Sequence, residues 1–145
     1  MAKKSELVAA YRATTYRVSL PDAVCDLRID QFSPLMRDSL KRMQFNTFAL
    51  LTACNPASQL LSREDNQKRQ NALRRELERG GVTYLVGDNL PDTEDWPVEP
   101  SVCIFDLSLQ DVCQLGLKYG QNAMIFGERD GIPRLRWLTD AESFC

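Results

Sequence analysis

Residues 45–86 constrain the fold more than any other part of the sequence. An apolar run at 45–53 predicts a buried strand, Asn55-Pro56 ends it, and residues 62–79 have the spacing of a long helix. Gly80-Gly81 then ends the helix before a second strand at 82–86. A strand, a helix and a strand in this order predict a right-handed crossover unit.

One face of the predicted helix carries polar side chains together with leucines. Ser62, Asn66, Arg69, Leu73 and Leu77 are four, three, four and four residues apart, so at about 100° per residue they fall within roughly 80° of arc. Leu73 and Leu77 are expected to face the core, so Asn66 and Arg69 point the same way. An unpaired polar group there costs about 1–3 kcal/mol, so we expect both to bind protein or ligand.

The remaining segments predict an α+β (mixed α/β) fold. We expect one mixed sheet of about six or seven strands, two or three packed helices and a short N-terminal helix. Residues 87–100 contain three prolines and five acidic residues, and we expect them to form an irregular loop. The other expected elements are helices at 6–12, from Ser33-Pro34 onward and after Ser108, a hairpin of 16–20 with 25–29, and strands at 101–107, 123–126 and 133–138.

Composition limits the class of protein. A chain of 145 residues predicts a single domain, 1–145, with a frayed tail at about 141–145. The net charge of −2 argues against nucleic-acid binding, because such proteins need a basic face. No apolar run is long enough to span a membrane, and the N-terminus lacks the pattern of a signal peptide. We therefore expect a cytoplasmic protein without a membrane partner.

The chain has five cysteines and no histidine. The cysteines are odd in number and none lies in a C-x-x-C pair, so we predict no disulfide and no metal site. We also expect no bound cofactor. Without histidine, acid–base chemistry would fall to carboxylates, Lys, Tyr or Cys. Cys54 follows the predicted strand but has no histidine base, so we interpret the cysteines as small buried side chains.

The candidate site lies where several predicted elements end. Ligands bind at the carboxyl ends of strands in open α/β sheets, and a helix start favours an anion, although the chain has no glycine-rich phosphate motif. Glu99, in the acidic loop, would contact the ligand from a lid or act as a general base. The candidate ligand-binding residues are Asn55, Ser58, Asn66, Arg69, Glu99, Gln121 and Asn122.

Each candidate also has a structural interpretation. Arg69 would form an ion pair with Glu99, Glu94 or Asp88, or it would form the floor of a site beneath the acidic loop; a lid held by an ion pair satisfies both. Trp96 would anchor the loop by packing or stack on a ligand. Gln121 and Asn122 would close a helix end or contact a polar ligand.

Two functions from different classes follow. The first is a site, enzymatic or not, for a polar or anionic small molecule resembling a nucleotide or a phosphorylated metabolite. The second is a non-enzymatic adapter or regulatory protein, in which the same residues form a closed polar network. A third, nucleic-acid contact through the basic residues of the long helix, is opposed by the acidic balance of the chain.

An ordered set of short motifs adds a resemblance. The motifs are AYRATTYRV near the start, then LRID, SPL, TACNPAS, LSREDN, WPVEPS and GQNA. This set resembles a family of small bacterial proteins known as domain of unknown function 3293, from about Ala10 to Leu138. The resemblance implies a cytosolic single-domain protein and implies no activity, catalytic residue or substrate.

Overall fold

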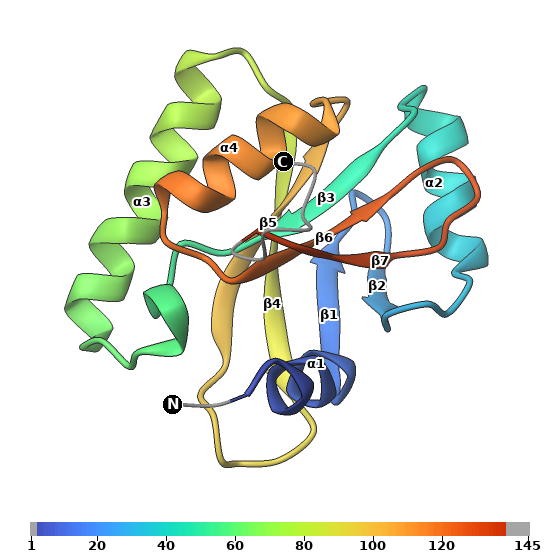
Figure 1. Ribbon diagram of the computed structural model, residues 1–145. Coiled ribbons are helices and arrows are strands. Elements are labelled where there is room, and N and C mark those ends of the chain that lie inside the picture. Colours follow the sequence, from blue (N-terminus) through green and yellow to red (C-terminus); the bar gives the residue numbers. More distant parts are fainter. Residues whose placement is uncertain (1–2, 139–145) are drawn as a thin grey trace.

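The computed structural model describes residues 3–138, so the tail predicted at 141–145 lies outside the described residues. This part of the chain forms one seven-stranded sheet with four α-helices and a short 3-10 turn (Figure 1). The helices are α1 (Lys4–Arg12), α2 (Pro34–Met43), α3 (Arg63–Arg79) and α4 (Leu109–Lys118), and the 3-10 turn is η1 (Pro56–Ser58). The strands are β1 (Thr14–Ser19), β2 (Val24–Leu27), β3 (Phe48–Leu51), β4 (Tyr84–Pro91), β5 (Glu99–Phe105), β6 (Ala123–Gly127) and β7 (Arg134–Trp137). The predicted α+β class is confirmed.

The strands are ordered β2-β1-β4-β5-β3-β6-β7, and every neighbouring pair is antiparallel. β3 and β4, which flank the long helix α3, point the same way because β5 lies between them and is antiparallel to both. The strand β5, which lies between β3 and β4 of the predicted crossover, comes from a later part of the chain. Local periodicity contains no information about such an insertion.

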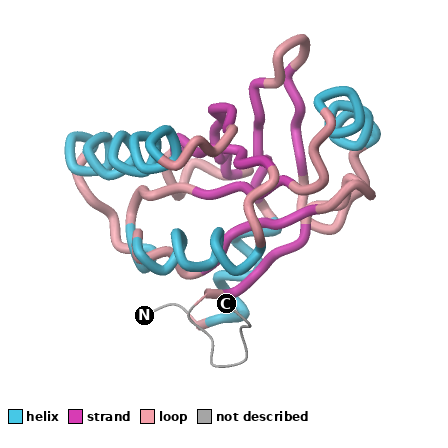
Figure 2. Tube along the Cα trace, turned by 90° about the horizontal axis from the view of Figure 1, so that it is seen from above, coloured by secondary structure: helices cyan, strands magenta, loops and turns pink. Residues whose placement is uncertain are grey.

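The sheet is covered on both faces, and alternation along the strands explains how. Phe48 and Leu50 of β3 pack with α2, whereas Ala49 and Leu51 pack with α3 and α4. Figure 1 shows α3 and α4 together on one side and α2 on the other, and Figure 2 shows from above that helices flank the strands on both sides. A central strand buried on both faces needs apolar side chains at successive positions, which accounts for the apolar run at 45–53.

Helix starts follow the local signals. Ser33, Ser62 and Ser108 each accept a hydrogen bond from the backbone N–H three residues later, at 3.0–3.1 Å, as N-cap residues do. The helices α2, α3 and α4 therefore begin where the serines indicated, whereas α1, expected to start at residue 6 after a Ser5 cap, begins at Lys4 and has no side-chain cap. No helix within residues 3–138 is long and apolar enough to cross a membrane.

Two sequence predictions about this fold are wrong. Residues 87–100 are not irregular throughout: β4 continues to Pro91 and β5 begins at Glu99, Asn89 pairs with Glu99 in the ladder, and the loop is confined to 92–98. Backbone pairing between the two strands overrides the turn-rich local composition. The absence of a disulfide is also wrong, because Cys113 is disulfide-bonded, and sequence spacing does not report distance in the fold. Cys25, Cys54 and Cys103 are buried free thiols, as predicted.

Candidate functional site

A cavity of about 430 Å³ lies between α1, the ends of the central strands and the loop from β4 to β5. Its wall comes from α1, β1, η1, the β4–β5 loop and the start of β6. Figure 1 shows α1 across the lower ends of β1 and β4. Five of the seven predicted site residues line it: Asn55, Ser58, Glu99, Gln121 and Asn122. Residues from distant parts of the sequence therefore meet at one concave surface.

Asn55 is the centre of a polar network at the end of β3. It adopts a left-handed backbone conformation with φ +47°, which asparagine tolerates better than most residues. Its side-chain oxygen accepts from Leu61 N at 2.9 Å and from Asn66 Nδ2 at 2.8 Å, while its Nδ2 donates to Glu99 at 2.6 Å. Asn66 Oδ1 in turn accepts from the backbone N–H of Asn55 at 2.8 Å. Asn66 therefore supports the site from behind and does not line the cavity.

Glu99 places a largely buried carboxyl group in the cavity wall. Oε2 accepts hydrogen bonds from Asn55 Nδ2 at 2.6 Å and from Trp96 Nε1 at 3.1 Å. Burial raises the pKa of Glu99 above its ordinary value, and these two hydrogen bonds offset the rise only in part. Both donors bind Oε2, and Oε1 accepts no hydrogen bond from the described residues.

The sheet register places Glu99 in a row with two other polar residues. Tyr16 of β1 lies opposite Asn89 of β4, and Asn89 lies opposite Glu99 of β5. Directly opposed residues point to the same face, with Cβ atoms about 4.5–5.5 Å apart, and all three line the cavity. The Oδ1 atom of Asn89 is buried and has no hydrogen-bond partner among the described residues. A buried acceptor without a donor thus lies next to the Glu99 carboxyl group.

Tyr11, Ser58 and Asn122 form another part of the wall. Asn122 Nδ2 donates to Ser58 Oγ at 3.0 Å. Burial raises the pKa of Tyr11 to about 12, with a further rise from the charge of Glu99 and a partial offset from hydrogen bonding with Ser58 and Asn122. The phenol therefore stays protonated near neutral pH and can act as a hydrogen-bond donor.

Gln121 has a structural role as well as a place in the wall. Its Nε2 donates to the carbonyl oxygens of Cys54 at 3.0 Å and Tyr119 at 3.3 Å. These bonds join the end of β3 to the end of α4. Gln121 is itself buried, so its amide is largely engaged by the protein.

Arg69 does not form the ion pair that the sequence suggested. Its Nε donates to the carbonyl oxygen of Ala53 at 2.6 Å, and its Nη2 donates to the carbonyl oxygen of Tyr119. Within residues 3–138 it forms no ion pair with Glu99, Glu94 or Asp88, and it does not line the cavity. Ala53 and Tyr119 have backbone carbonyl oxygens that lack a partner in regular secondary structure. The guanidinium satisfies these two oxygens instead of pairing with a carboxylate of the acidic loop.

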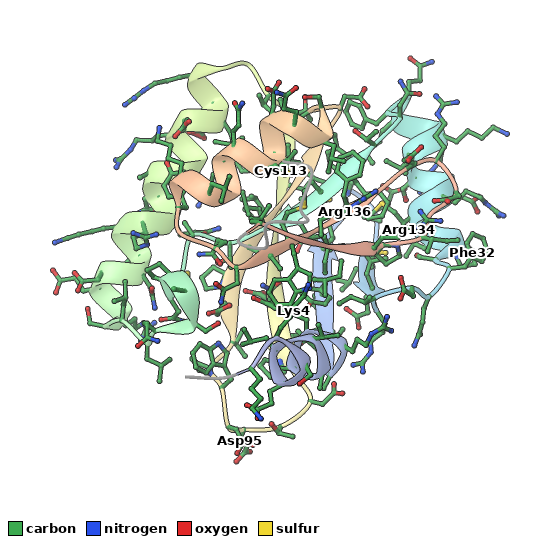
Figure 3. All side chains as sticks on the ribbon, viewed as in Figure 1. Lys4, Phe32, Asp95, Cys113, Arg134 and Arg136 are labelled. Carbon is green, nitrogen blue, oxygen red and sulfur yellow. The ribbon has the colours of Figure 1, made fainter. Side chains whose placement is uncertain are left out.

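The charge of the cavity wall is acidic. Its ionisable acids are Glu99 inside, Glu6 on α1 and Asp95 in the loop. The Asp95 side chain points away from the body of the protein (Figure 3). None of the described lining residues is Lys or Arg. Lys4 of α1 lies instead over the ring of Trp137, with Nζ 5.3 Å from its centroid. The cation that an anionic ligand would need is therefore not in the wall.

The chemistry open to this site is hydrogen bonding and proton exchange. Burial raises the pKa of the Cys54 thiol, which lowers its reactivity, and its sulfur lies 4.0 Å from two backbone carbonyl oxygens. Burial raises the pKa of the lining carboxyl group of Glu99. A carboxyl group in that state can give or take a proton near neutral pH more readily than an exposed one.

Sequence reasoning missed the residues that α1, β1 and β4 bring to the site. Tyr11, Tyr16 and Asn89 line the cavity; the two tyrosines lie far in sequence from residues 45–86, and Asn89 lies in the segment predicted to be an irregular loop. The pairing of Tyr16 and Asn89 depends on the β1–β4 register, and no local signal predicts that register. Trp96 could be recognised from the sequence as a candidate, because it is an aromatic residue within an acidic segment.

Comparison with known proteins identifies a family. The model of a family described as "Protein of unknown function (DUF3293)" matches residues 51–124, just over half of the chain. The matched range runs from the end of β3 to the start of β6 and contains all seven predicted site residues. No curated protein and no solved structure matches the chain significantly.

Proposed function

Because the chain belongs to the DUF3293 family of proteins of unknown function, we propose a function from the cavity itself: it binds a small polar molecule between α1 and the sheet. The observation that carries the proposal is the concave space of about 430 Å³ with the Glu99 carboxyl group in its wall. Sites for small molecules usually have about 300–1,000 Å³, mostly apolar walls and a few convergent polar groups. Leu7, Leu50 and Ile125 supply apolar wall here.

The acidic charge of the cavity wall favours some classes of ligand over others. A nucleotide or a phosphorylated metabolite is the less favoured ligand, because no described lining residue is cationic and Glu99 would face its phosphate. Arg69, which would have supplied the charge, donates to backbone carbonyl oxygens. Glu99 and Tyr11 favour a ligand with hydrogen-bonding groups and an apolar body, and Glu99 can exchange a proton with it.

A cavity-blocking variant tests the proposal. Ala10 lines the cavity from an exposed position on α1, so Ala10→Trp is expected to occupy the space without disturbing the core. Ala9→Trp is the matched control, because Ala9 is also exposed on α1 but is not a lining residue. In a fragment screen followed by ¹H–¹⁵N NMR, we expect to find compounds that shift the signals of lining residues. Ala10→Trp should weaken the binding of these compounds at least about tenfold. Fragments that bind Ala10→Trp as well as wild type would contradict the proposal.

The non-enzymatic adapter remains the second candidate. Val98, in the loop held by the Trp96–Glu99 hydrogen bond, is 55% exposed, and an ordered loop with an exposed apolar side chain suits a protein contact. This alternative requires no ligand in the cavity. The same screen therefore separates the two: fragments that bind at the lining residues support the first candidate, and a screen without any such fragment supports the adapter.

A further inference from the structure

We infer that the ligand carries a planar cationic group with two N–H donors, an amidinium or guanidinium, on a flat apolar body. This inference rests on the proposed function and names the ligand class of the same cavity. It starts from the row that the register builds across β1, β4 and β5, where Asn89 lies between Tyr16 and Glu99.

Two neighbouring acceptors in this row lack donors. Asn89 Oδ1 is buried without a hydrogen-bond partner among the described residues. Glu99 Oε1 accepts none from them either, because Asn55 and Trp96 both donate to Oε2. Asn89 Oδ1 is the buried acceptor whose unpaired state is unfavourable, and Glu99 Oε1 is free to accept a further hydrogen bond in the same cavity wall. A ligand with a pair of N–H donors would satisfy both oxygens.

An amidinium or guanidinium fits that requirement geometrically. Its two parallel N–H groups can bridge neighbouring acceptors, and its positive charge compensates a carboxylate that is largely removed from water. Glu99, together with Glu6 and Asp95, gives the wall a negative field that favours a cation, and no described lining residue is a Lys or Arg that would repel it. A carboxylate or phosphate on the ligand would instead meet Glu99 without a counter-charge.

The rest of the wall suits a flat apolar body. The aromatic residues Tyr11, Tyr16 and Trp96 line the same cavity, with Leu50 and Ile125 from the sheet. Trp96 is held in place because its Nε1 donates to Glu99 at 3.1 Å. Aromatic faces also attract cations. The aromatic walls and the paired acceptors therefore favour one class of molecule, an aryl amidine or a guanidine on a flat apolar group.

Three probes of the same shape and different charge test the inference. Benzamidinium, benzamide and benzoate are titrated separately into ¹⁵N-labelled protein, and the Trp96 indole N–H signal is followed because this group donates to Glu99. Its assignment is made with Trp96→Phe. We expect benzamidinium to bind at least about tenfold more tightly than benzamide, and benzoate to bind most weakly, because charge-assisted hydrogen bonds are the stronger ones.

Variants of the two acceptors connect the preference to the row. Glu99→Gln is expected to remove the preference, so that benzamidinium and benzamide bind alike. Asn89→Ala is expected to weaken benzamidinium several-fold and benzamide less. Glu94→Gln is the matched control, because Glu94 is exposed in the same loop and is not a lining residue, and it should leave all three affinities unchanged. If Glu99→Gln does not fold, as judged by its ¹H–¹⁵N spectrum, Asn89→Ala carries the test.

Each outcome has a defined meaning. Binding of all three probes with equal affinity, tighter binding of benzoate, or a preference that survives both variants overturns the charge assignment but leaves the proposed function standing. Failure of all three probes to shift any signal of a lining residue overturns the charge assignment, and the fragment screen then decides the proposed function by itself.

Discussion

Arg69 joins the end of β3 to the end of α4 inside the fold. Its guanidinium donates to the carbonyl oxygen of Ala53, after β3, and to that of Tyr119, after α4. Both acceptors belong to backbone that has left its regular hydrogen-bonding ladder, so the arginine replaces partners that the secondary structure does not provide. The side chain thus holds the base of the site without contacting the cavity.

Arg69→Lys should therefore lower stability without changing the ligand site. A lysine has one compact ammonium and cannot reach both carbonyl oxygens in the fixed geometry of a guanidinium. We expect a loss of about 1.5–3 kcal/mol in the free energy of unfolding, the range for hydrogen bonds to charged groups, measured by urea denaturation. Arg75→Lys, on the exposed side of the same helix, is the control and should change it by less than about 0.5 kcal/mol. An equal loss in both variants would contradict this role for Arg69.

The Glu99 carboxyl group makes stability depend on pH. Burial raises its pKa in the folded protein, so the native state keeps the proton at a pH where the unfolded chain releases it. Its contribution to stability is therefore fully present below the unfolded pKa and is lost as the pH rises through the folded pKa. The ionisable groups around it are Tyr11 and Glu6 of α1, Tyr16 of β1, Cys54 after β3 and Asp95 of the loop.

Glu99→Gln removes this titration. We expect the free energy of unfolding of the variant, relative to wild type, to rise as the pH increases from the ordinary glutamate pKa through the raised pKa of folded Glu99, as measured by urea denaturation at several pH values. Glu94→Gln, in the exposed part of the same loop, is the control and should follow the wild-type curve. If the difference in unfolding free energy between Glu99→Gln and wild type stays constant with pH, the pKa of Glu99 is not raised by burial.

At the scale of elements, the pairing of β1 with β4 that contributes Tyr16 and Asn89 to the polar row includes a close approach at Gly87. Gly87 pairs with Val18, and a Cβ at this position would overlap the carbonyl oxygen of Arg17. The close approach two residues before Asn89 fixes where the Asn89 side chain meets Tyr16.

Gly87→Ala should push these strands apart. We expect a loss of about 1–3 kcal/mol, typical of overpacking, together with shifted NMR signals at Tyr16 and Asn89. Gly80→Ala is the matched control, because a Cβ there meets only ordinary contacts, 3.5 Å from the nearest atom, and its effect should lie between zero and a small gain. Unchanged stability in Gly87→Ala would mean that the ladder adjusts without strain.

At the scale of the whole molecule, the cavity is closed by the least buried helix. α1 has no fully buried residue, whereas β3 is buried on both faces. Two hydrogen bonds attach α1 to β1. Thr14 Oγ1 donates to the carbonyl oxygen of Ala10 at 2.8 Å, and the Tyr16 hydroxyl donates to the carbonyl oxygen of Tyr11 at 2.8 Å. Local opening follows the lack of buried contacts, so α1 is the element expected to open first.

Native-state hydrogen exchange tests this order of opening. The amide protons of α1 should exchange with a lower opening free energy than those of β3 and β5, and a bound fragment should slow exchange in α1 but leave α2 unchanged, because α2 contributes no lining residue. Equal protection of α1 and β3 in the free protein would contradict the prediction. α2 serves as the internal reference in both states.

The sequence by itself determined the local elements and the region of the site. Serine caps, the two leucines of α3 and the apolar run of β3 depend on chemistry within a few residues, so their positions could be read directly. Asn55, Ser58, Glu99, Gln121 and Asn122 stand at the ends of such elements, and they line one cavity in the structure.

Only the tertiary structure decided what those residues face. The insertion of β5 between β3 and β4, the register that places Asn89 beside Glu99, and the position of α1 over the strands all arise from contacts between distant segments. Those contacts directed Arg69 to backbone carbonyl oxygens and left the cavity wall acidic. Side-chain chemistry is encoded locally, but its partner is selected by packing across the whole chain, because hydrogen bonds form only between groups that the fold brings within reach.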